Sequence, residues 1–210
     1  MARAGTSRDK LLDAAFLLIR AQGYAGTTVD ELCAAAGVTK GAFFHHFRSK
    51  DDLAVAAADH WSEVTGAFFA GAPYHLHADP LDRVIGYLEF RKAILQGPVA
   101  EFTCLVGTMV QEAYDAHPAI RAACDASISD HAARVEADIA AAMEERGISA
   151  ASWSPRSLAL HFQAVLQGAF VLAKAKGGAA VAIDSLDHLI LYVRLLFDNE
   201  TTTPARGNLS

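Results

Sequence analysis

The chain has 210 residues, enough for one large domain or for a small domain joined to a larger one. Hydrophobic residues make up 52% and charged residues 20% of it, which excludes an intrinsically disordered chain. The net charge of −6 argues at first sight against a nucleic-acid partner. However, residues 1–50 contain seven Lys or Arg and four acids, a net charge of +3, and the remainder carries −9. A basic N-terminal segment on an acidic chain is the distribution expected of a polyanion-binding module.

No apolar run of signal-peptide length follows the basic N-terminus, which predicts a cytoplasmic protein. The longest apolar stretch, residues 158–173, is interrupted by His161, Gln163 and Gln167. A bilayer core penalises such residues, so we interpret this segment as a buried helix and expect no membrane partner.

Hydrophobic residues recur at helical spacing along nearly the whole chain, without an alternating strand pattern or an internal repeat. Ser/Thr-x-x-acid patterns mark helix starts at Thr6, Thr28 and Ser49. We expect about nine helices, among them a short one begun by Thr28 and others over residues 6–22, 39–46, 49–70, 80–96, 100–115, 118–145, 155–176 and 184–198. Residues 74–79 are expected to form a loop, and residues 200–210 a polar, frayed tail.

Two of the short helices flank the turn at residues 36–39. In this turn Gly37 can take a positive φ, and Thr39 can cap the following helix. Two short helices joined by a tight glycine turn form a helix-turn-helix. At about 100° per residue, Lys40, Gly41, Phe44 and His45 share the outward face of the second helix, whereas Phe43 points into the core.

The outward face suits a DNA groove better than a protein core. Lys40 can reach a phosphate or a guanine edge, and Ala42 can touch a thymine methyl group. His45 and His46 can donate hydrogen bonds to phosphates or base acceptors. Thr39 and Lys50 begin helices, where free N–H groups favour phosphate oxygens.

The ordered string Gly26-Thr-Thr-Val-Asp-Glu-Leu32 followed by Ala36-Gly-Val-Thr-Lys-Gly-Ala-Phe-Phe-His-His-Phe-Arg-Ser-Lys-Asp-Asp-Leu53 resembles the head of the tetracycline-repressor-like (TetR) family. The resemblance covers about the first quarter of the chain. It implies a homodimeric regulator, usually a repressor of a palindromic DNA operator, whose C-terminal domain binds a small-molecule effector. The expected fold is all-α, with a three-helix helix-turn-helix head over residues 1–53, a larger helical ligand-binding and dimerisation domain over 54–199, and the tail over 200–210.

Carried over position by position, the resemblance assigns DNA contacts to Thr28, Thr39, Lys40, Gly41, Ala42, Phe44, His45, His46 and Lys50. Phe44 departs from the family pattern, in which this position is commonly a tyrosine whose hydroxyl meets a phosphate. Phenylalanine cannot make that hydrogen bond. We therefore expect the other polar side chains of the set to carry more of the contact.

Large apolar residues after residue 53 are candidates for an effector pocket, because bundle cores are where such sites form. They are Trp61, Phe68, Tyr87, Phe90, Phe102, Met109 and Phe162, with Arg91, His131 and Gln167 as candidate polar anchors. Each is alternatively an ordinary core residue. The set favours an apolar or aromatic effector, and nothing indicates a cofactor.

The last two predicted helices are apolar on more than one side, so they need partners on more than one side. The pattern comprises Leu158, Phe162, Val165, Leu166, Ala169, Phe170 and Ala173 on the first helix, and Leu186, Leu189, Ile190, Val193, Leu196 and Phe197 on the second. A homodimer interface of four packed helices meets this need.

Alternative functions have little support in the sequence. A helical enzyme is disfavoured by the absence of a G-x-S-x-G, a Gly-rich phosphate loop, an H-E-x-x-H and a carboxylate pair on one helix face. A constitutive architectural DNA binder would be a compact basic protein.

Metal and redox sites are also disfavoured. The adjacent His45 and His46 point in different directions, and the His75/His77 loop near Asp79 lacks a second half of a metal site. Cys33, Cys104 and Cys124 are odd in number and widely spaced, which predicts reduced thiols. Cys104 is read as a core residue, with an oxidant sensor as the alternative.

Overall fold

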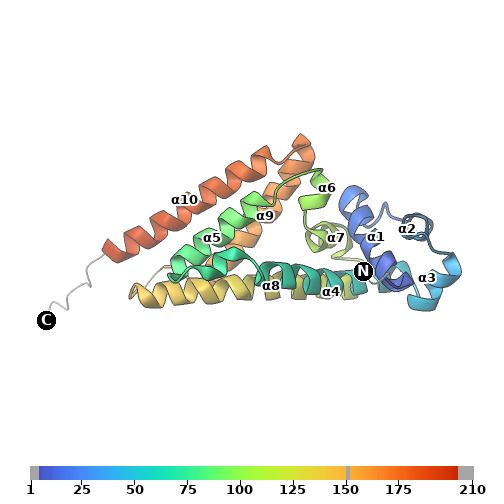
Figure 1. Cartoon of the computed structure of the whole chain (residues 1–210), viewed down its shortest axis with the longest axis horizontal. Helices are drawn as coiled ribbons and strands as arrows, with labels where there is room; N and C mark the ends of the chain where they lie inside the picture. Colours follow the sequence, from blue (N-terminus) through green and yellow to red (C-terminus); the bar gives the residue numbers. More distant parts are fainter. Residues whose placement is uncertain (1–4, 150–151, 203–210) are drawn as a thin grey trace. The chain divides into compact units, whose positions relative to one another are not determined.

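The computed structural model describes residues 5–149 and 152–202, and these contain α-helices and one 3₁₀-helix but no strand. The all-α prediction is therefore confirmed. In chain order the elements are α1 (Ser7–Gln22), α2 (Val29–Ala36), α3 (Lys40–His46), α4 (Lys50–Ala70), η1 (Pro73–Leu76), α5 (Pro80–Ala93), α6 (Val99–Phe102), α7 (Leu105–Ala113), α8 (Pro118–Glu145), α9 (Pro155–Lys176) and α10 (Ala180–Thr202) (Figure 1).

The predicted helix over residues 100–115 is wrong as a single helix. Thr103 and Cys104 are extended and separate α6 from α7. The Sγ atom of Cys104 accepts a hydrogen bond from the backbone N–H of Gly107 at 3.4 Å, so this cysteine caps α7. Cysteine is not among the residues that usually cap helices, which is why the break has no signal in the sequence.

Other boundaries also differ from the prediction. The loop expected at residues 74–79 contains η1, and α5 ends at Ala93 rather than near residue 96. The last helix begins at Ala180 and continues to Thr202, so the predicted tail is helical at its start. The rest of that tail, residues 203–210, lies outside the described residues.

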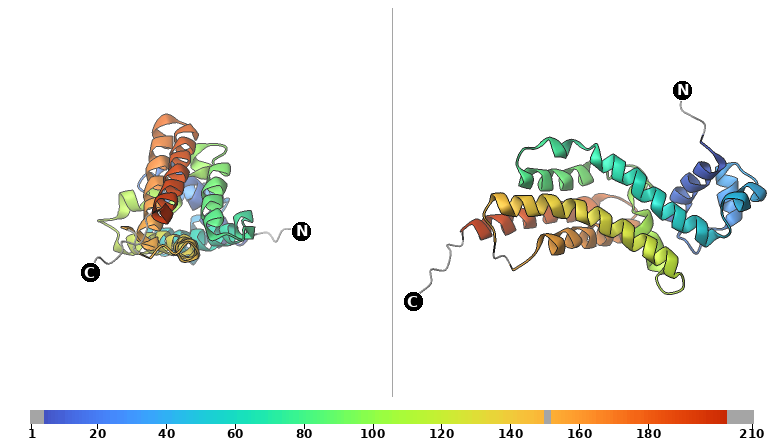
Figure 2. Two further views of the ribbon diagram at one scale, coloured as in Figure 1. Left: turned by 90° about the vertical axis from the view of Figure 1, so that its left-hand side faces the viewer. Right: turned by 90° about the horizontal axis from the view of Figure 1, so that it is seen from below.

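Residues 1–70 and 96–131 form one compact unit. Within it, α1 packs against α2, α3, α4, α6 and α7. Figures 1 and 2 both show α1, α2 and α3 gathered around the start of α4. The core of this unit is built from Leu11, Leu12, Ala15, Ile19, Leu32, Phe43, Phe47, Leu53, Leu105, Val106 and Met109.

The predicted helix starts are confirmed by their capping hydrogen bonds. Thr6 with Asp9 and Thr28 with Glu31 each form a complete capping box, in which hydroxyl and carboxylate satisfy each other's backbone N–H. At α4 the Ser49 hydroxyl accepts from the N–H of Asp52, but the Asp52 carboxylate accepts from the N–H of Arg48 rather than that of Ser49.

The second compact unit comprises the described residues within 71–95 and 132–202, in which α10 packs against both α9 and α5. Its core includes Leu158, Phe162, Leu166, Leu186, Val193 and Phe197. These units group residues by packing, and the proposed division of function at residue 53 stays a prediction.

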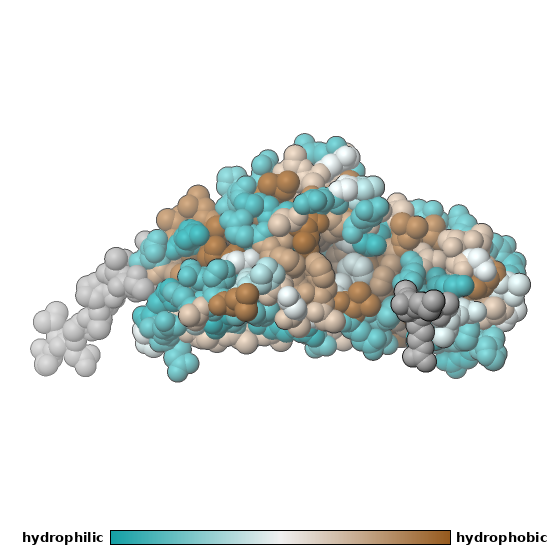
Figure 3. All heavy atoms as spheres, viewed as in Figure 1, coloured by the Kyte–Doolittle hydropathy of each residue, from teal (hydrophilic) through white to brown (hydrophobic). Residues whose placement is uncertain are grey.

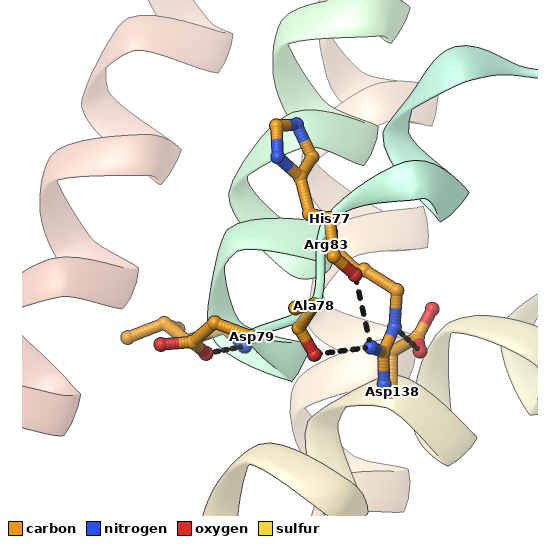
Figure 4. A network of polar contacts seen from close by, with 6 residues as sticks. His77, Ala78, Asp79, Arg83 and Asp138 are labelled. Atoms are coloured by element: carbon orange, nitrogen blue, oxygen red, sulfur yellow. Dashed lines mark hydrogen bonds and ion pairs between the residues drawn. The ribbon is translucent and has the colours of Figure 1, made fainter.

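Polar contacts fix the start of α5 in the second unit. Arg83 donates through Nε to Asp138 at 2.7 Å and through Nη1 to the carbonyl oxygens of His77 at 3.2 Å and Ala78 at 3.0 Å (Figure 4). Asp79 accepts from the backbone N–H of Leu81 and from Arg146, each at 2.7 Å. The start of α5 is therefore bound by one ion pair to Asp138 of α8 and by another to Arg146, which directly follows α8.

Among the described residues, α9 is the one helix long and apolar enough to cross a membrane. However, 44% of its most apolar window is buried, and a core helix of a globular protein passes the same test. The burial of its Leu158, Phe162 and Leu166 against other helices supports the reading of α9 as a core helix.

Candidate nucleic-acid interface

The turn between α2 and α3 has the conformation that the sequence predicts. Gly37 is left-handed, with φ 64° and ψ 37°, and its N–H donates to the carbonyl of Ala34. Thr39 is extended, and its hydroxyl accepts from the N–H of Ala42 at 3.2 Å. The glycine allows the sharp reversal, and the threonine fixes the first residue of α3.

Phe43 and Phe44 separate the inner and outer faces of α3. Phe43 is fully buried, whereas 56% of Phe44 is exposed. The two rings meet edge to face at 5.1 Å between centroids. Thr39, Lys40, Gly41 and His45 are exposed as well, and Ala42 and His46 are half-buried. The outward face expected of α3 is therefore present.

Gly41 is not required by the interior of the protein. A Cβ atom built on it would meet only the Thr39 hydroxyl oxygen, at 3.7 Å, which is an ordinary contact. Internal packing therefore does not require a glycine at this position, and the missing side chain leaves free space on the outer surface of α3.

Lys40 forms an ion pair with Asp30 of α2, with 2.7 Å between Nζ and Oδ1. The hydrogen bond to Asp30 raises the pKa of Lys40, so the amine stays protonated. Both side chains are about two-thirds exposed, at 63% and 66%. Water screens such a pair strongly, which makes the lysine available to a competing anion.

Lys50 lies at the start of α4, but its amine turns toward the loop between α1 and α2. Nζ donates to the carbonyl oxygens of Tyr24 and Thr27, at 3.0 Å each, and lies 4.2 Å from the centroid of the Tyr24 ring. A phosphate contact by this amine would require it to exchange those bonds. The expected DNA role of Lys50 stays a prediction.

Thr28 is exposed at the start of α2 and is engaged in its own cap. Its hydroxyl accepts from the N–H of Glu31 at 3.2 Å and donates to the Glu31 carboxylate at 2.8 Å. The hydrogen bonds from the N–H and hydroxyl of Thr28 lower the pKa of Glu31.

A second polar group, which the sequence does not indicate, joins the head to α7 and to the loop between α7 and α8 within the first unit. Asp51 accepts hydrogen bonds from the Tyr24 hydroxyl and from His117 Nδ1, the latter at 2.8 Å. Glu112 accepts from the N–H of Ala25 at 2.7 Å. The hydrogen bond from Tyr24, followed by that from His117, lowers the pKa of Asp51. No local pattern links residues so far apart in the chain.

Gly23 has a steric role in the same place. Its φ of 86° favours glycine, and any side chain here would collide with the carboxylate of Glu112. The end of α1 is therefore shaped to receive a residue from α7.

The ten candidate effector residues divide equally between the two compact units. The first unit contains Trp61, Phe68, Phe102, Met109 and His131, and the second contains Tyr87, Phe90, Arg91, Phe162 and Gln167. In the first unit Met109 is fully buried in the core, whereas 51% of Phe68 is exposed. Trp61 is half-buried, with the guanidinium of Arg20 5.1 Å from its ring centroid.

In the second unit the structure groups aromatic residues from η1 and α5. The ring of Tyr74 lies edge to face with that of Tyr87 at 5.7 Å and 6.0 Å from that of Phe90. Arg91 donates from Nε to the Tyr87 hydroxyl at 3.1 Å. Burial raises the pKa of Tyr74 to about 12, so its hydroxyl is neutral at physiological pH.

Gln167, the predicted polar anchor on α9, is half-buried, whereas Gln163 is almost fully buried. Sequence reasoning treated Gln163 only as an interruption of an apolar run. The three cysteines are free thiols. Within residues 5–149 and 152–202, no three His, Cys, Asp or Glu side chains are grouped so as to hold a metal ion.

Two family models match the chain. One, described as bacterial regulatory proteins of the tetR family, matches residues 11–57. The other, described as the C-terminal domain of tetracyclin repressor-like proteins, matches residues 80–189, which is more than half of the 210 residues.

Sequence relatives match mainly the head. The chain is 44% identical over 50 residues to the HTH-type transcriptional regulator AcrR of Shigella flexneri. These residues are 24% of this chain and 23% of AcrR. It is also 38% identical over 60 residues to the HTH-type transcriptional regulator LmrA of Bacillus subtilis, and these residues are 28% of this chain and 32% of LmrA. The aligned part therefore spans less than a third of either relative.

Solved structures are similar over nearly the whole chain. A TetR transcriptional regulator from Chloroflexus aurantiacus has a TM-score of 0.75 at 27% identity, covering 90% of this chain and 94% of that one. A TetR-family regulator from Agrobacterium tumefaciens has a TM-score of 0.77 at 20% identity, covering 89% and 96%.

A capped helix-turn-helix on a larger helical domain defines the class of helix-turn-helix transcriptional regulators. Within that class, this chain belongs to the TetR family. It combines the family's helix-turn-helix head with the family's C-terminal domain, and members of the family are not enzymes.

Proposed function

We propose that the chain is a homodimeric repressor that leaves a palindromic operator when a small molecule binds its C-terminal domain. The observation that carries the proposal is the outward face of α3, where Lys40, Gly41, Phe44 and His45 are exposed on a helix fixed by Thr39 and Phe43. Because its target is chromosomal DNA, we expect the protein in the cytoplasm.

On the operator, α3 lies in the major groove with its exposed residues toward the bases and phosphates. Lys40 exchanges its Asp30 partner for a phosphate or for guanine acceptors. Gly41 lets the helix backbone approach closely, and Phe44 supplies an apolar contact. Thr28, Thr39, Ala42, His45, His46 and Lys50 complete the proposed contact set. Two copies of α3 read half-sites about 34–36 Å apart, as two-fold symmetry requires.

The proposed dimer interface lies on α9 and α10. Most of the apolar residues whose pattern suggested it are buried within the chain itself, so the interface is proposed on other residues of the same two helices. Large apolar residues are exposed on both helices, namely Leu160, Val171, Leu172, Leu191, Tyr192 and Leu195. The rings of His161 and Tyr192 lie 5.5 Å apart, so the two exposed faces adjoin. Figure 3 shows hydrophobic residues gathered along α10 on the side turned to the viewer. A second copy that brings the same two helices would cover this surface with a four-helix packing.

Effector binding acts through differential affinity. In one conformation of the dimer, the spacing of the two heads does not match successive major grooves. A ligand that binds this conformation more tightly shifts the population away from the DNA-bound state, with a coupling free energy between ligand binding and DNA binding of about 1–3 kcal/mol. We expect the effector to be an apolar or aromatic small molecule, because the candidate lining consists mostly of such residues.

The proposal is tested by titrating the protein against the DNA upstream of its own gene at several salt concentrations. Lys40→Ala should weaken binding about tenfold and reduce the salt slope by about one unit. Lys176→Ala, at the exposed C-terminal end of α9, is the matched control and should bind as the wild type does. The absence of a specific complex, or an unchanged salt slope for Lys40→Ala, would refute the DNA-binding role.

Asp30→Asn sharpens the same experiment. Removing the carboxylate that pairs with Lys40 frees the amine and removes a negative charge from the head, so operator binding should tighten by about twofold to threefold. Weaker binding would mean that Asp30 is needed to position Lys40. An operator complex that no metabolite of a broad panel releases would indicate a constitutive binder instead.

A further inference from the structure

The side chain of Gln163 on α9 is nearly removed from solvent, with 6% of the residue exposed. Its Nε2 atom is buried and has no hydrogen-bond partner within the described part of the chain. The amide of Gln111, by contrast, is paired, because its Nε2 donates to the carbonyl of Gly107 at 2.7 Å. Gln163 therefore differs from a glutamine that merely completes local structure.

The helix face around Gln163 is mostly apolar, apart from the half-buried amide of Gln167 one turn further on, which does not pair with the Nε2 atom of Gln163. At 100° per residue, Ala159, Leu166 and Phe170 lie within about 60° of it, and all three are buried. Leaving an amide donor unpaired in apolar surroundings costs free energy, and buried polar groups in proteins are nearly always paired. A donor in this state is available to a partner that is not part of the folded chain.

We propose that Gln163 is the polar anchor of the effector site, and that the effector is a neutral carbonyl compound with an apolar or aromatic body. This rests on the proposed function. The free group is an N–H donor, so the ligand must supply an acceptor. An uncharged amide does not compensate the burial of an anion, which favours a ketone, ester or amide oxygen over a carboxylate. The buried rings of Phe162 and Phe170 on the same helix suit an apolar body.

The unpaired donor has a consequence for the unliganded protein. Gln163→Met replaces the amide with a flexible apolar chain of similar length, so it should raise the melting temperature by about 2–4 °C. Gln111→Met, which removes a paired amide, is the matched control and should not raise it. A lower melting temperature for Gln163→Met would show that the amide already has a partner, such as an internal water, and would overturn the proposal.

A ligand pair tests the anchor directly. Acetophenone and ethylbenzene have similar shapes and differ in a carbonyl oxygen, so their dissociation constants can be compared by calorimetry on the full-length protein. The wild type should prefer acetophenone about tenfold, and Gln163→Met should lose that preference while Gln111→Met keeps it. No acetophenone binding, no preference in the wild type, or a preference that survives in Gln163→Met would each overturn the anchor.

Operator binding by the wild type is measured in parallel to separate the two levels of the proposal. A wild type that binds its operator but shows no preference for acetophenone contradicts the anchor alone. A wild type that binds no operator contradicts the proposed function. Acetophenone that binds through Gln163 and also weakens the operator complex supports both.

Discussion

The helix caps of the head and the ion pairs of the second compact unit are polar contacts of very different range. In the head, Thr6 pairs with Asp9, Thr28 with Glu31 and Thr39 with the N–H of Ala42, each three residues apart. In the second unit, Arg83 pairs with Asp138, Arg146 with Asp79 and Lys92 with Asp187, at separations of 55, 67 and 95 residues. The difference explains why the head can be recognised from its sequence, whereas the polar contacts of the other unit cannot.

In the head, the buried residues and the proposed DNA-contact residues lie on opposite sides of the short helix α3. The neighbouring residues Phe43 and Phe44 test this separation. Phe43→Ala should destabilise the protein by about 3–5 kcal/mol, because Phe43 is fully buried in the head core. The free energy of unfolding from urea titration measures the effect.

Phe44→Ala is the control for that substitution, since 56% of Phe44 is exposed. Its stability should stay within about 0.5 kcal/mol of the wild type while operator binding weakens. Phe44→Tyr should tighten operator binding, because the added hydroxyl can donate to a phosphate. Equal destabilisation by the two alanine substitutions would contradict the separation of the two faces.

The second unit lacks such a division on a single short helix, and its proposed binding surface is a broad apolar face. Leu195→Asp places a charge on that face in both copies of a dimer, so it should weaken dimerisation about 100-fold. Sedimentation equilibrium checks this. Leu76→Asp changes an 87% exposed leucine of η1 and should leave the association state unchanged. A monomeric wild type, or a Leu195→Asp dimer as tight as the wild type, would contradict the interface.

Most of the fold was predictable because helical periodicity and caps are local signals. The bounds of α8 and α9 and the caps at Thr6, Thr28 and Thr39 were predicted correctly. The break between α6 and α7 was missed, since its cap is the thiol of Cys104 rather than a hydroxyl or carboxylate.

The outward face of α3 was predictable from helix geometry, but the partners of its cations were not. The Asp30 carboxylate that holds Lys40 and the carbonyls that hold Lys50 depend on how α2 and the α1–α2 loop pack. Similarly, periodicity marks Gln163 and Gln167 only as polar interruptions of α9. Burial, which distinguishes them, depends on the helices that pack against α9.

Substitution of Arg83 tests how much the long-range contacts of the second unit contribute to the free energy of unfolding. Arg83→Met removes the ion pair with Asp138 and two hydrogen bonds to carbonyl oxygens, and should cost about 1–3 kcal/mol in the free energy of unfolding. Thr28→Ala removes a local cap and should cost about 1 kcal/mol. If Arg83→Met costs less than Thr28→Ala, the long-range network contributes less to stability than its geometry indicates.

The smallest effect is expected at Asp51, where the head contains a long-range contact of its own. The hydrogen bonds from Tyr24 and then from His117 hold the pKa of Asp51 below its ordinary value of 3.8. A carboxyl whose pKa is lowered by folding stabilises the protein at pH values above the unfolded-state pKa. That contribution is lost as the pH falls through the lower, folded-state pKa.

Asp51→Asn should therefore reduce stability slightly between pH 5 and 7, and the difference from the wild type should shrink progressively as the pH falls below about 4. The effect is small because half of the Asp51 side chain is exposed and solvent screens it. Urea unfolding at several pH values measures it. Tyr24→Phe removes the hydroxyl that donates to Asp51. The stability of this variant should therefore depend less on pH below about 4 than that of the wild type. If the stability difference between the wild type and Asp51→Asn instead grew toward acid pH, the protonated form of Asp51 would be the stabilising one. In that case the hydrogen bonds to the Asp51 carboxylate would not stabilise the contact between the head and the α7–α8 segment.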